Sequence, residues 1–412
     1  MALRALMVAP AMPARRGNGL AMRLGIFLEA LQKIAQTDLI FIPIAGAAAM
    51  PAPTGVRVLT APLRPDTELS LLMRLKDLQQ RLQSFVEYGK PILAGQFSSS
   101  AWAELARQST DGPYDIVHIS RAYMSPALRH FRGRSATTLD FDEDDRASFT
   151  SLAGLERKRG NVFQEAWYEQ EGEACDHLVS EAAVALDLAF AANVGEVQSL
   201  CGRHAGLRIE YLPNAVDIPR SRRVSRGDTL LFVGTLGYLP NNEGLHWFLE
   251  NVLPRIRARR ACRIVIIGRG ALLGLRVAAA RAGVHLLDRV DDLEHYYRSA
   301  RAVIAPMRSG GGTRIKLLEA ASFGVPSIAT PEAASGLYSE ARPWGWIARG
   351  PQEFADACLE ALSNAKEAAI RASIGRRAVS KNFDRAKIVR QLSRRFEKLA
   401  EEGEKSRDKD RQ

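Results

Sequence analysis

The chain has 412 residues, of which 46% are hydrophobic, and its formal net charge is +11 at pH 7. A chain of this length is too long to fold around one hydrophobic core of ordinary size, so we expect two domains. No stretch reaches the roughly 18 uncharged apolar residues of a membrane-spanning helix, and the first twenty residues lack the features of a signal peptide. The four scattered cysteines fit neither a disulfide framework nor a zinc site. We therefore expect a cytoplasmic protein whose positive charge suits anionic partners.

Short apolar runs alternate with helical patterns along the whole chain, which is typical of parallel α/β proteins. Apolar residues at helical spacing begin at Leu24 and again at Leu245, and Pro254 is expected to end or kink the second of these helices. Buried strands are predicted at residues 4–9, 39–43, 56–60, 116–119, 136–139 and 178–180 in the first half, and at 229–233, 263–267, 284–287, 302–305 and 326–328 in the second.

A segment bounded by Pro213 and Pro219, followed by polar and basic residues up to 228, is the best candidate for an interdomain linker. We therefore predict a first domain over residues 1–219 and a second over 220–384. An apolar stripe predicts a final helix over 385–400. Residues 401–412 are nearly all charged and are expected to be solvated or disordered.

Residues 308–320, RSGGGTRIKLLEA, place three glycines against two cations and a carboxylate, directly after a predicted strand. We predict a helix that begins at an N-cap Thr313, where unpaired N–H groups and a partial positive charge suit a phosphate. Gly312, Lys316 and Glu319 share one face of this helix. The pattern indicates a nucleoside-diphosphate site in which Glu319 takes the ribose hydroxyls. The alternative is a flexible surface loop with Lys316 and Glu319 as a solvated ion pair.

This stretch, read on as GGGTRIKLLEAASFGVPSIAT, resembles the donor-site motif of GT-B glycosyltransferases of the retaining family 4 type. Three further segments agree with that family in order and spacing: YLPNAVD, LLFVGTLGYLPNNEGLHWFLENVLPRI, and RIVIIGRG with the following VHLLDRVDDLEHYYRSARAVIAPMRSG. The resemblance is continuous over roughly residues 211–335. It implies two Rossmann-like domains that face each other across a cleft, with the helix at 385–400 returning to the first domain.

The resemblance implies that the second domain binds the donor. Arg314 and Lys316 would contact the diphosphate and stabilise the charge that grows on it when the sugar leaves, which makes both candidate catalytic residues. Glu319 would hold the ribose. Further donor-binding positions are implied at Gly234, Val290, Gly311, Gly312 and Thr313.

In the first domain, Gly17 and Gly19 follow the first strand, where the family's glycine loop touches the phosphates. An ordinary turn explains the two glycines as well. His118 stands at the end of a predicted strand, near where family members often carry a histidine that touches the donor sugar or the acceptor. We predict a catalytic role for His118, with a hydrogen-bonded core histidine as the alternative.

The chain departs from the family pattern at two positions. Gly311 stands where the family has the first of two glutamates, the one that meets the donor sugar, and Thr235 follows Gly234 of the FVG segment, where a basic residue is common. We hypothesise that Arg314 compensates. The departure leaves the identity of the sugar open.

Acidic residues at 142–144, Asp-Glu-Asp, match the metal-binding Asp-x-Asp of the other glycosyltransferase fold, GT-A. The nucleotide signals lie far downstream, so we expect no metal and assign these acids to a loop that orients an acceptor hydroxyl. A leucine stripe at 71–85 and a basic cluster at 129–134 could dock on an anionic membrane that carries a lipid-linked acceptor. An ordinary helix that packs on the sheet is the alternative. No nucleic-acid-binding module is recognisable, so we expect no nucleic-acid partner.

We therefore expect a retaining glycosyltransferase that moves a sugar from a UDP- or GDP-sugar to a hydroxyl of a glycan or lipid-linked acceptor, in cell-envelope or exopolysaccharide synthesis. It would act in the cytoplasm, with peripheral contact at the inner face of the membrane, and without a cofactor beyond its donor. Two alternatives remain. One is a catalytically inactive nucleotide-sugar-binding subunit, which the missing carboxylate at Gly311 suggests, and the other is a nucleotide-sugar epimerase of the same fold.

Overall fold

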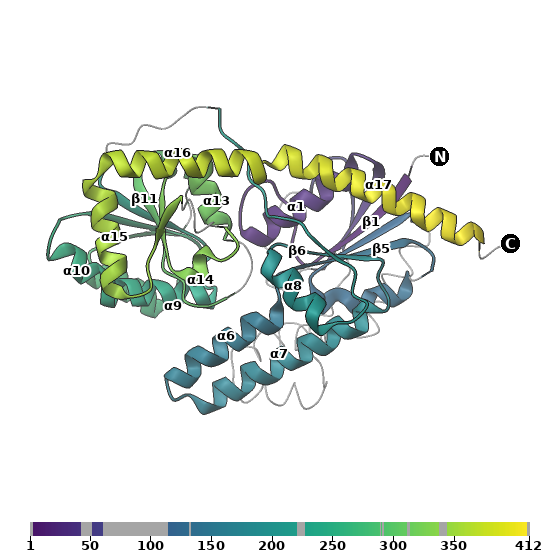
Figure 1. Cartoon of the computed structure of the whole chain (residues 1–412), viewed down its shortest axis with the longest axis horizontal. Helices are drawn as coiled ribbons and strands as arrows, with labels where there is room; N and C mark the ends of the chain where they lie inside the picture. Colours follow the sequence, from purple (N-terminus) through teal and green to yellow (C-terminus); the bar gives the residue numbers. More distant parts are fainter. Residues whose placement is uncertain are drawn as a thin grey trace. The chain divides into compact units, whose positions relative to one another are not determined.

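The structure is a computed structural model that describes residues 3–42, 52–60, 114–131, 133–220, 227–288, 290, 292–310, 314–337 and 344–409. The chain divides into two compact units (Figure 1). Unit 1 comprises residues 1–213 and 387–412, and unit 2 comprises residues 214–386. Unit 2 begins ahead of the predicted boundary at 219/220 because Val216 forms a β-bridge with Asp384 and the Pro219 carbonyl accepts a hydrogen bond from Arg376.

Unit 1 is built on a seven-stranded parallel sheet in the order β3-β2-β1-β4-β5-β6-β7. Its apolar runs are long because parallel strands in such a sheet are covered on both faces, and every residue of β4 is buried. The strands are β1 (Leu3–Ala9), β2 (Ala35–Phe41), β3 (Arg57–Thr60), β4 (Ile116–Ser120), β5 (Ala136–Asp142), β6 (Leu188–Ala191) and β7 (Ile209–Tyr211).

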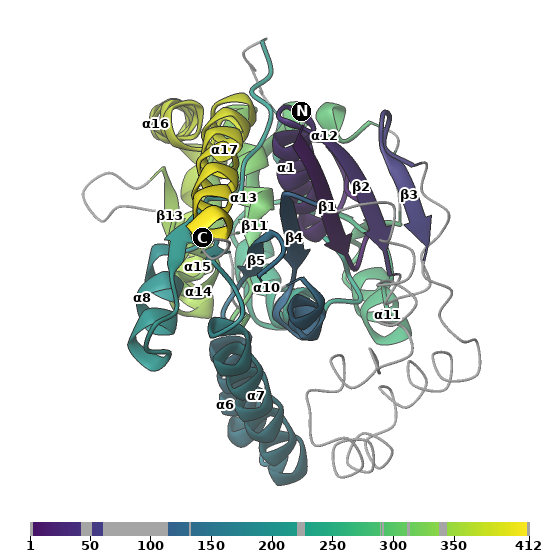
Figure 2. The same ribbon diagram turned by 90° about the vertical axis from the view of Figure 1, so that its right-hand side faces the viewer.

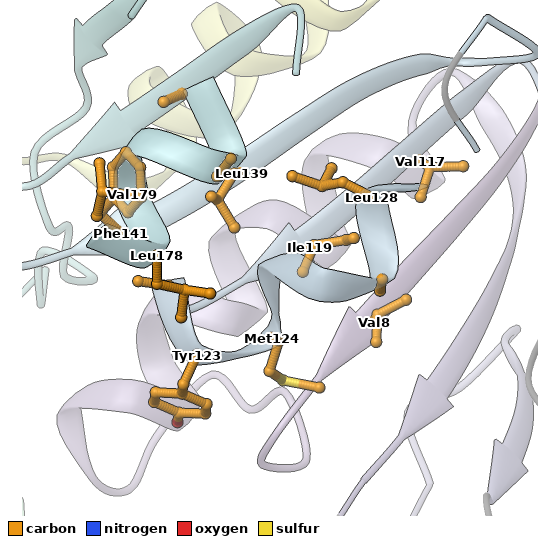
Figure 3. Close-up of a cluster of buried hydrophobic side chains, with 14 of the residues drawn as sticks. Val8, Val117, Ile119, Tyr123, Met124, Leu128, Leu139, Phe141, Leu178 and Val179 are labelled. Atoms are coloured by element: carbon orange, nitrogen blue, oxygen red, sulfur yellow. The ribbon is translucent and has the colours of Figure 1, made fainter. Parts of the chain in front are cut away.

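Helices cover both faces of this sheet. On one face lie α1 (Gly19–Gln32) and α17 (Arg385–Lys409), where Phe27 packs against Phe396. On the other face the strands pack against η1 (Ala122–His130), α7 (Val162–Ala183) and α8 (Val194–Arg203). Figure 3 shows this core, in which Met124 and Leu128 of η1 lie over Val8 and Ile119 of the strands. Helices α6 (Asp145–Lys158) and α7 form a hairpin that extends away from the sheet (Figure 2).

One strand prediction for unit 1 is wrong. Residues 178–180 are not a strand but part of α7, where Leu178 and Val179 belong to a buried stripe that recurs at helical spacing from Trp167. Of the two expectations for the charged tail, solvated or disordered, the structure fits the first: α17 continues through it to residue 409 with an i,i+4 pair between Lys398 and Glu402, and residues 401, 402, 404 and 405 are exposed.

Unit 2 has a six-stranded parallel sheet in the order β10-β9-β8-β11-β12-β13. On one face α9 contacts α11 and α10 contacts α15, and on the other α13 contacts α16 and, through Phe323 and Tyr297, α12 (Figures 1 and 2). The strands are β8 (Thr229–Val233), β9 (Arg263–Ile267), β10 (His285–Leu287), β11 (Ala300–Ala305), β12 (Ser327–Ala329) and β13 (Gly345–Ile347). The helices are α9 (Leu239–Trp247), η2 (Phe248–Val252), α10 (Leu253–Arg257), α11 (Leu273–Arg281), α12 (Leu293–Ser299), α13 (Ile315–Ser322), α14 (Pro331–Ala334), α15 (Pro351–Ser363) and α16 (Ala365–Asn382).

The expected irregularity at Pro254 is confirmed. Helix α9 passes into the π-helical turn η2 and then into α10, whose first turn contains Pro254. Proline lacks the N–H group that would bond to the carbonyl four residues earlier, so the regular ladder is interrupted there.

Both sheets reverse their strand order at one point, between β1 and β4 in unit 1 and between β8 and β11 in unit 2. In open parallel sheets ligands bind outside the carboxyl ends of the strands at this point. The prediction of two parallel-sheet domains is confirmed, and each has a potential ligand-binding edge. Within the described part of the chain, no helix is both long and apolar enough to cross a membrane.

Candidate functional site

The site in unit 2 lies at the point where its strand order reverses. Gly234 directly follows β8, and the glycine-rich stretch connects β11 to α13. The structure begins α13 at Ile315 with Arg314 as the N-cap residue, so the predicted cap at Thr313 is wrong. Gly311, Gly312 and Thr313 lie outside the described residues, and their predicted contacts with a phosphate stay predictions.

The ammonium group of Lys316 is closely surrounded by other groups beside the end of β8. Its Nζ donates a hydrogen bond to Oδ1 of Asn241 at 2.8 Å and lies 4.0 Å from the centre of the Phe232 ring. A Cβ atom at Gly234 would approach the same Nζ to 2.9 Å, so glycine at that position leaves room for the ammonium group. Burial, and then the charge of Arg314, lower the pKa of Lys316 well below its ordinary value, although Glu319 opposes the shift. The side chain is thus a desolvated amine whose protonated form an anion would stabilise.

Asn241 is a site residue that the sequence analysis missed. Its Oδ1 accepts from Lys316, and its Nδ2 donates to the carbonyl of Thr235 at 2.8 Å, so it connects the lysine to the loop after β8. The side chain is buried in the first turn of α9. Its place in that turn, directly after the loop that follows β8, was the only sequence signal for it.

Arg314 is held on its own loop. Its Nη2 donates to the carbonyls of Ser309 and Gly310, and Gly310 has φ +90°, a conformation that favours glycine. Nε of Arg314 and Oγ of Ser309 are buried, and neither has a hydrogen-bond partner among the described residues. Unsatisfied buried donors are costly, so they mark a place where a polar ligand would be favourable. Whether Arg314 compensates for the missing carboxylate stays a prediction.

Glu319 lies half-buried one turn further along α13. Its Oε2 accepts a hydrogen bond from the hydroxyl of Tyr297 at 2.9 Å. Lys316 and Glu319 therefore both have defined partners within unit 2, which differs from a solvated pair on a flexible loop. Val290, predicted as a donor-binding position, packs beside the buried cluster that contains Val303 and Ala320, while its neighbours 289 and 291 lie outside the described residues.

Gly268 sets the spacing of the two loops next to this site. A Cβ atom there would lie 1.7 Å from the carbonyl oxygen of Gly234, which no side-chain movement can relieve. We expect Gly268→Ala to destabilise unit 2 by roughly 3 kcal/mol, at the upper end of overpacking effects, and to displace Gly234. Thermal unfolding of the purified chain measures this.

Gly274→Ala is the matched control for Gly268→Ala. Gly274 lies in α11, and the nearest atom to its added Cβ is 3.9 Å away. That substitution should raise stability by about 0.5–1 kcal/mol, because alanine is the better helix former. Equal stability of the two variants would contradict the proposed steric role.

In unit 1, the glycines after β1 lead into α1 as expected. Gly17 has φ +134°, and Asn18 caps the helix by accepting from the Ala21 N–H at 2.8 Å, with Gly19 as the first helical residue. The positive φ of Gly17 and the start of α1 at Gly19 are enough to explain glycine at both positions. A contact of Gly17 and Gly19 with phosphates stays a prediction.

His118 is completely buried in unit 1. Its Nδ1 is 2.9 Å from Oγ1 of Thr138, its Nε2 is 3.2 Å from Oγ of Ser120, and its ring stacks on Phe27 with centroids 4.0 Å apart. Burial and then the charge of Arg23 lower the pKa of His118 to about 3, so the ring is neutral at physiological pH. These contacts fit the alternative of a hydrogen-bonded core histidine, and its catalytic role stays a prediction.

The acids at 142–145 are paired with arginines. Arg121 contacts Asp142 at 3.4 Å and Asp145 at 2.7 Å, while Asp144 caps α6 and contacts Arg203 at 2.9 Å. Among the described residues, no group of His, Cys, Asp and Glu is arranged to hold a metal ion. The structure assigns these acids to an ion-pair network of unit 1.

The predicted membrane-docking stripe at 71–85 lies outside the described residues. Of the basic cluster at 129–134, residues 129–130 end η1 and residue 132 is not described. Membrane contact therefore stays a prediction.

Comparison with known proteins finds a family match for the sequence of most of unit 2 and similar folds for nearly the whole chain. Residues 227–364 match the family model described as glycosyl transferases group 1. No curated protein sequence matches the chain.

Solved structures match nearly the full length of the chain. They include sucrose-phosphate synthase from Thermosynechococcus elongatus (TM-score 0.68, 12% identity, 96% of this chain and 99% of that one). Others are Anabaena HepE in complex with UDP-glucose (0.62, 13%, 96% and 100%) and the trehalose 6-phosphate synthase of Burkholderia multivorans (0.65, 14%, 98% and 98%). At these identities the match establishes the fold, and the chain has the two-domain GT-B fold.

Proposed function

Residues 227–364 carry a group 1 glycosyltransferase domain, and from this premise we propose that the protein transfers a sugar from a nucleoside-diphosphate sugar to a hydroxyl group, with retention at the anomeric carbon. The observation that carries the proposal is the constellation of Lys316, Glu319 and Gly234 at the point where the strand order of unit 2 reverses. The desolvated side chain of Lys316 suits a diphosphate, and the carboxylate of Glu319, one turn away, suits a ribose. The backbone at Gly234, which has no side chain, lets the ligand approach closely.

In this proposal Lys316 supplies the main catalytic effect. As the bond between sugar and diphosphate breaks, negative charge grows on the leaving phosphate, and the ammonium group stabilises it more strongly in this partly desolvated setting than it would in water. The unsatisfied Nε of Arg314 and the start of α13 add donors on the same side. The departing phosphate would take the acceptor proton, so no separate protein base is required.

UDP is the donor base that we propose first, because solved structures of the similar protein HepE contain UDP and UDP-glucose. GDP is the second. For the acceptor we propose a glycan or lipid-linked hydroxyl at the cytoplasmic face of the membrane, in cell-envelope or exopolysaccharide synthesis, consistent with the net charge of +11.

The test incubates the full chain with UDP- and GDP-sugars, with and without glycan and lipid-linked acceptor fractions. Free nucleoside diphosphate that appears only with acceptor is the expected result, and NMR of the product should show the anomeric configuration of the donor. An inverted product contradicts retention. An epimerised sugar without acceptor indicates the epimerase, and thermal stabilisation by nucleotide without turnover indicates the inactive binding subunit, which the glycine at 311 suggests.

Binding of the diphosphate should be accompanied by proton uptake at Lys316. Burial lowers its pKa in the empty site, and the anion raises it again, so between these two pKa values the complex holds one more proton than the unbound protein. The affinity for UDP should therefore fall as the pH rises through this window. Calorimetry in buffers of different ionisation enthalpy measures the uptake, and the same uptake in Lys316→Met would assign it to another group.

A further inference from the structure

Tyr297 lies directly behind the carboxylate of Glu319. It comes from α12, which precedes β11, whereas Glu319 comes from α13, which follows it. The Tyr297 hydroxyl donates to Oε2 of Glu319 at 2.9 Å, and the tyrosine side chain is only 1% exposed. This contact joins two helices on the same face of the unit 2 sheet through a single phenol.

The tyrosine ring itself is held rigidly. It stacks on Phe323, the residue that ends α13, with centroids 5.1 Å apart and planes within 12° of parallel. Burial, and then Glu319, raise the pKa of Tyr297 well above its ordinary value, so the phenol keeps its proton and remains a donor at every working pH.

A glutamate side chain has three rotatable bonds, and it can take two hydroxyls of a ribose only if both carboxylate oxygens are aimed correctly. A donor that fixes one oxygen removes much of this freedom before the ligand arrives. Glu319 is half-buried, so rotamers that reach solvent remain open to its side chain, and the bond from Tyr297 disfavours them.

We propose that Tyr297 is a positioning residue that orients the Glu319 carboxylate for the ribose diol, and thereby sets the preference of this site for ribonucleotides over deoxyribonucleotides. The inference rests on the proposed nucleotide-sugar function. It adds a residue whose hydroxyl does not contact the nucleotide and acts only through Glu319.

The experiment compares binding of UDP and 2′-deoxy-UDP, or the GDP pair if the wild type prefers guanine, by calorimetry with the full chain. The wild type should bind the ribonucleotide at least about tenfold more tightly, as expected for a hydrogen bond to a charged acceptor. Tyr297→Phe keeps the ring, the stack and the burial. It should weaken ribonucleotide binding by about three- to tenfold and reduce the ribo-to-deoxy ratio to within about threefold, with deoxynucleotide binding little changed.

Tyr296→Phe is the matched control, since it removes a phenol from the neighbouring position of α12 and should leave the ratio unchanged. In a Glu319→Ala background, which leaves the Tyr297 hydroxyl no side-chain acceptor at position 319, Tyr297→Phe should have no further effect on the ratio, because the two residues act as one unit. Should Tyr297→Phe fold poorly, 3-fluorotyrosine at position 297 changes the strength of the same donor within an intact core, and it should change the ratio.

The outcomes separate the two proposals. A wild type that binds neither UDP nor GDP overturns the proposed function, and a wild type that binds both ribo and deoxy forms equally overturns ribose recognition by Glu319. A wild type that discriminates, together with a Tyr297→Phe variant that discriminates equally well, overturns the role of Tyr297 alone.

Discussion

Lys316→Met should reduce turnover of the nucleotide-sugar by about 10²- to 10³-fold, the typical effect of removing one preorganised donor that stabilises a developing anion. The substitution keeps a long apolar side chain against the Phe232 ring but removes the ammonium group that lies 4.0 Å from it. Steady-state kinetics of nucleoside-diphosphate release measures the loss, and calorimetry with UDP should show weaker binding.

Lys366→Met is the matched control for this variant. Lys366 is exposed at the start of α16, so the change removes the same charge from the same unit without touching the site. It should retain wild-type activity. If Lys316→Met also stays within about threefold of the wild type, the lysine does not bind the diphosphate and the reading of the site is wrong.

Arg23→Met should destabilise unit 1 by about 3–5 kcal/mol, the usual cost of removing one partner of a buried ion pair. Arg23 is fully buried on α1 and makes a two-pronged contact with Asp140, with Nε–Oδ2 at 2.7 Å and Nη2–Oδ1 at 2.6 Å. A third bond reaches the carbonyl of Leu212 at 3.0 Å. Without the guanidinium group, Asp140 would remain 1% exposed with its charge no longer balanced by that group.

Urea titration with hydrogen-exchange mass spectrometry follows unit 1 separately and measures this effect. The double variant Arg23→Met, Asp140→Asn should regain a large part of the lost stability, because it no longer buries an uncompensated carboxylate. Arg157→Met is the control, since Arg157 contacts Glu165 and Glu169 on the surface of the α6–α7 hairpin and should contribute little. A loss in Arg23→Met no larger than in Arg157→Met would contradict the structural role.

Much of unit 2 was predictable from sequence for one physical reason. Strands β8, β9 and β11 are covered on both faces, so they appear as uninterrupted apolar runs that few other structures produce. The same rule failed at residues 178–180, where a short apolar run belongs to the buried stripe of α7. It also missed β13, whose sequence is Gly-Trp-Ile, and β6 and β7 of unit 1.

The candidate site was predictable only in part. Helical periodicity alone places Lys316 and Glu319 on one face of α13, because residues three apart on a helix are neighbours. Their partners were not predictable. Asn241 lies 75 residues from Lys316 in sequence, and Tyr297 lies 22 residues from Glu319, and no local pattern records such contacts.

His118 illustrates the same limit in unit 1. Its predicted position at the end of a strand indicated a functional residue, whereas His118 is the middle residue of β4 and is enclosed by Phe27 and Thr138 from other elements. By itself the sequence therefore determined the parallel α/β architecture, the two domains and the charged face of α13, all of which follow from local spacing and burial. Only the tertiary structure decided which groups surround each charge, because solvation and hydrogen bonding depend on residues brought together by chain folding.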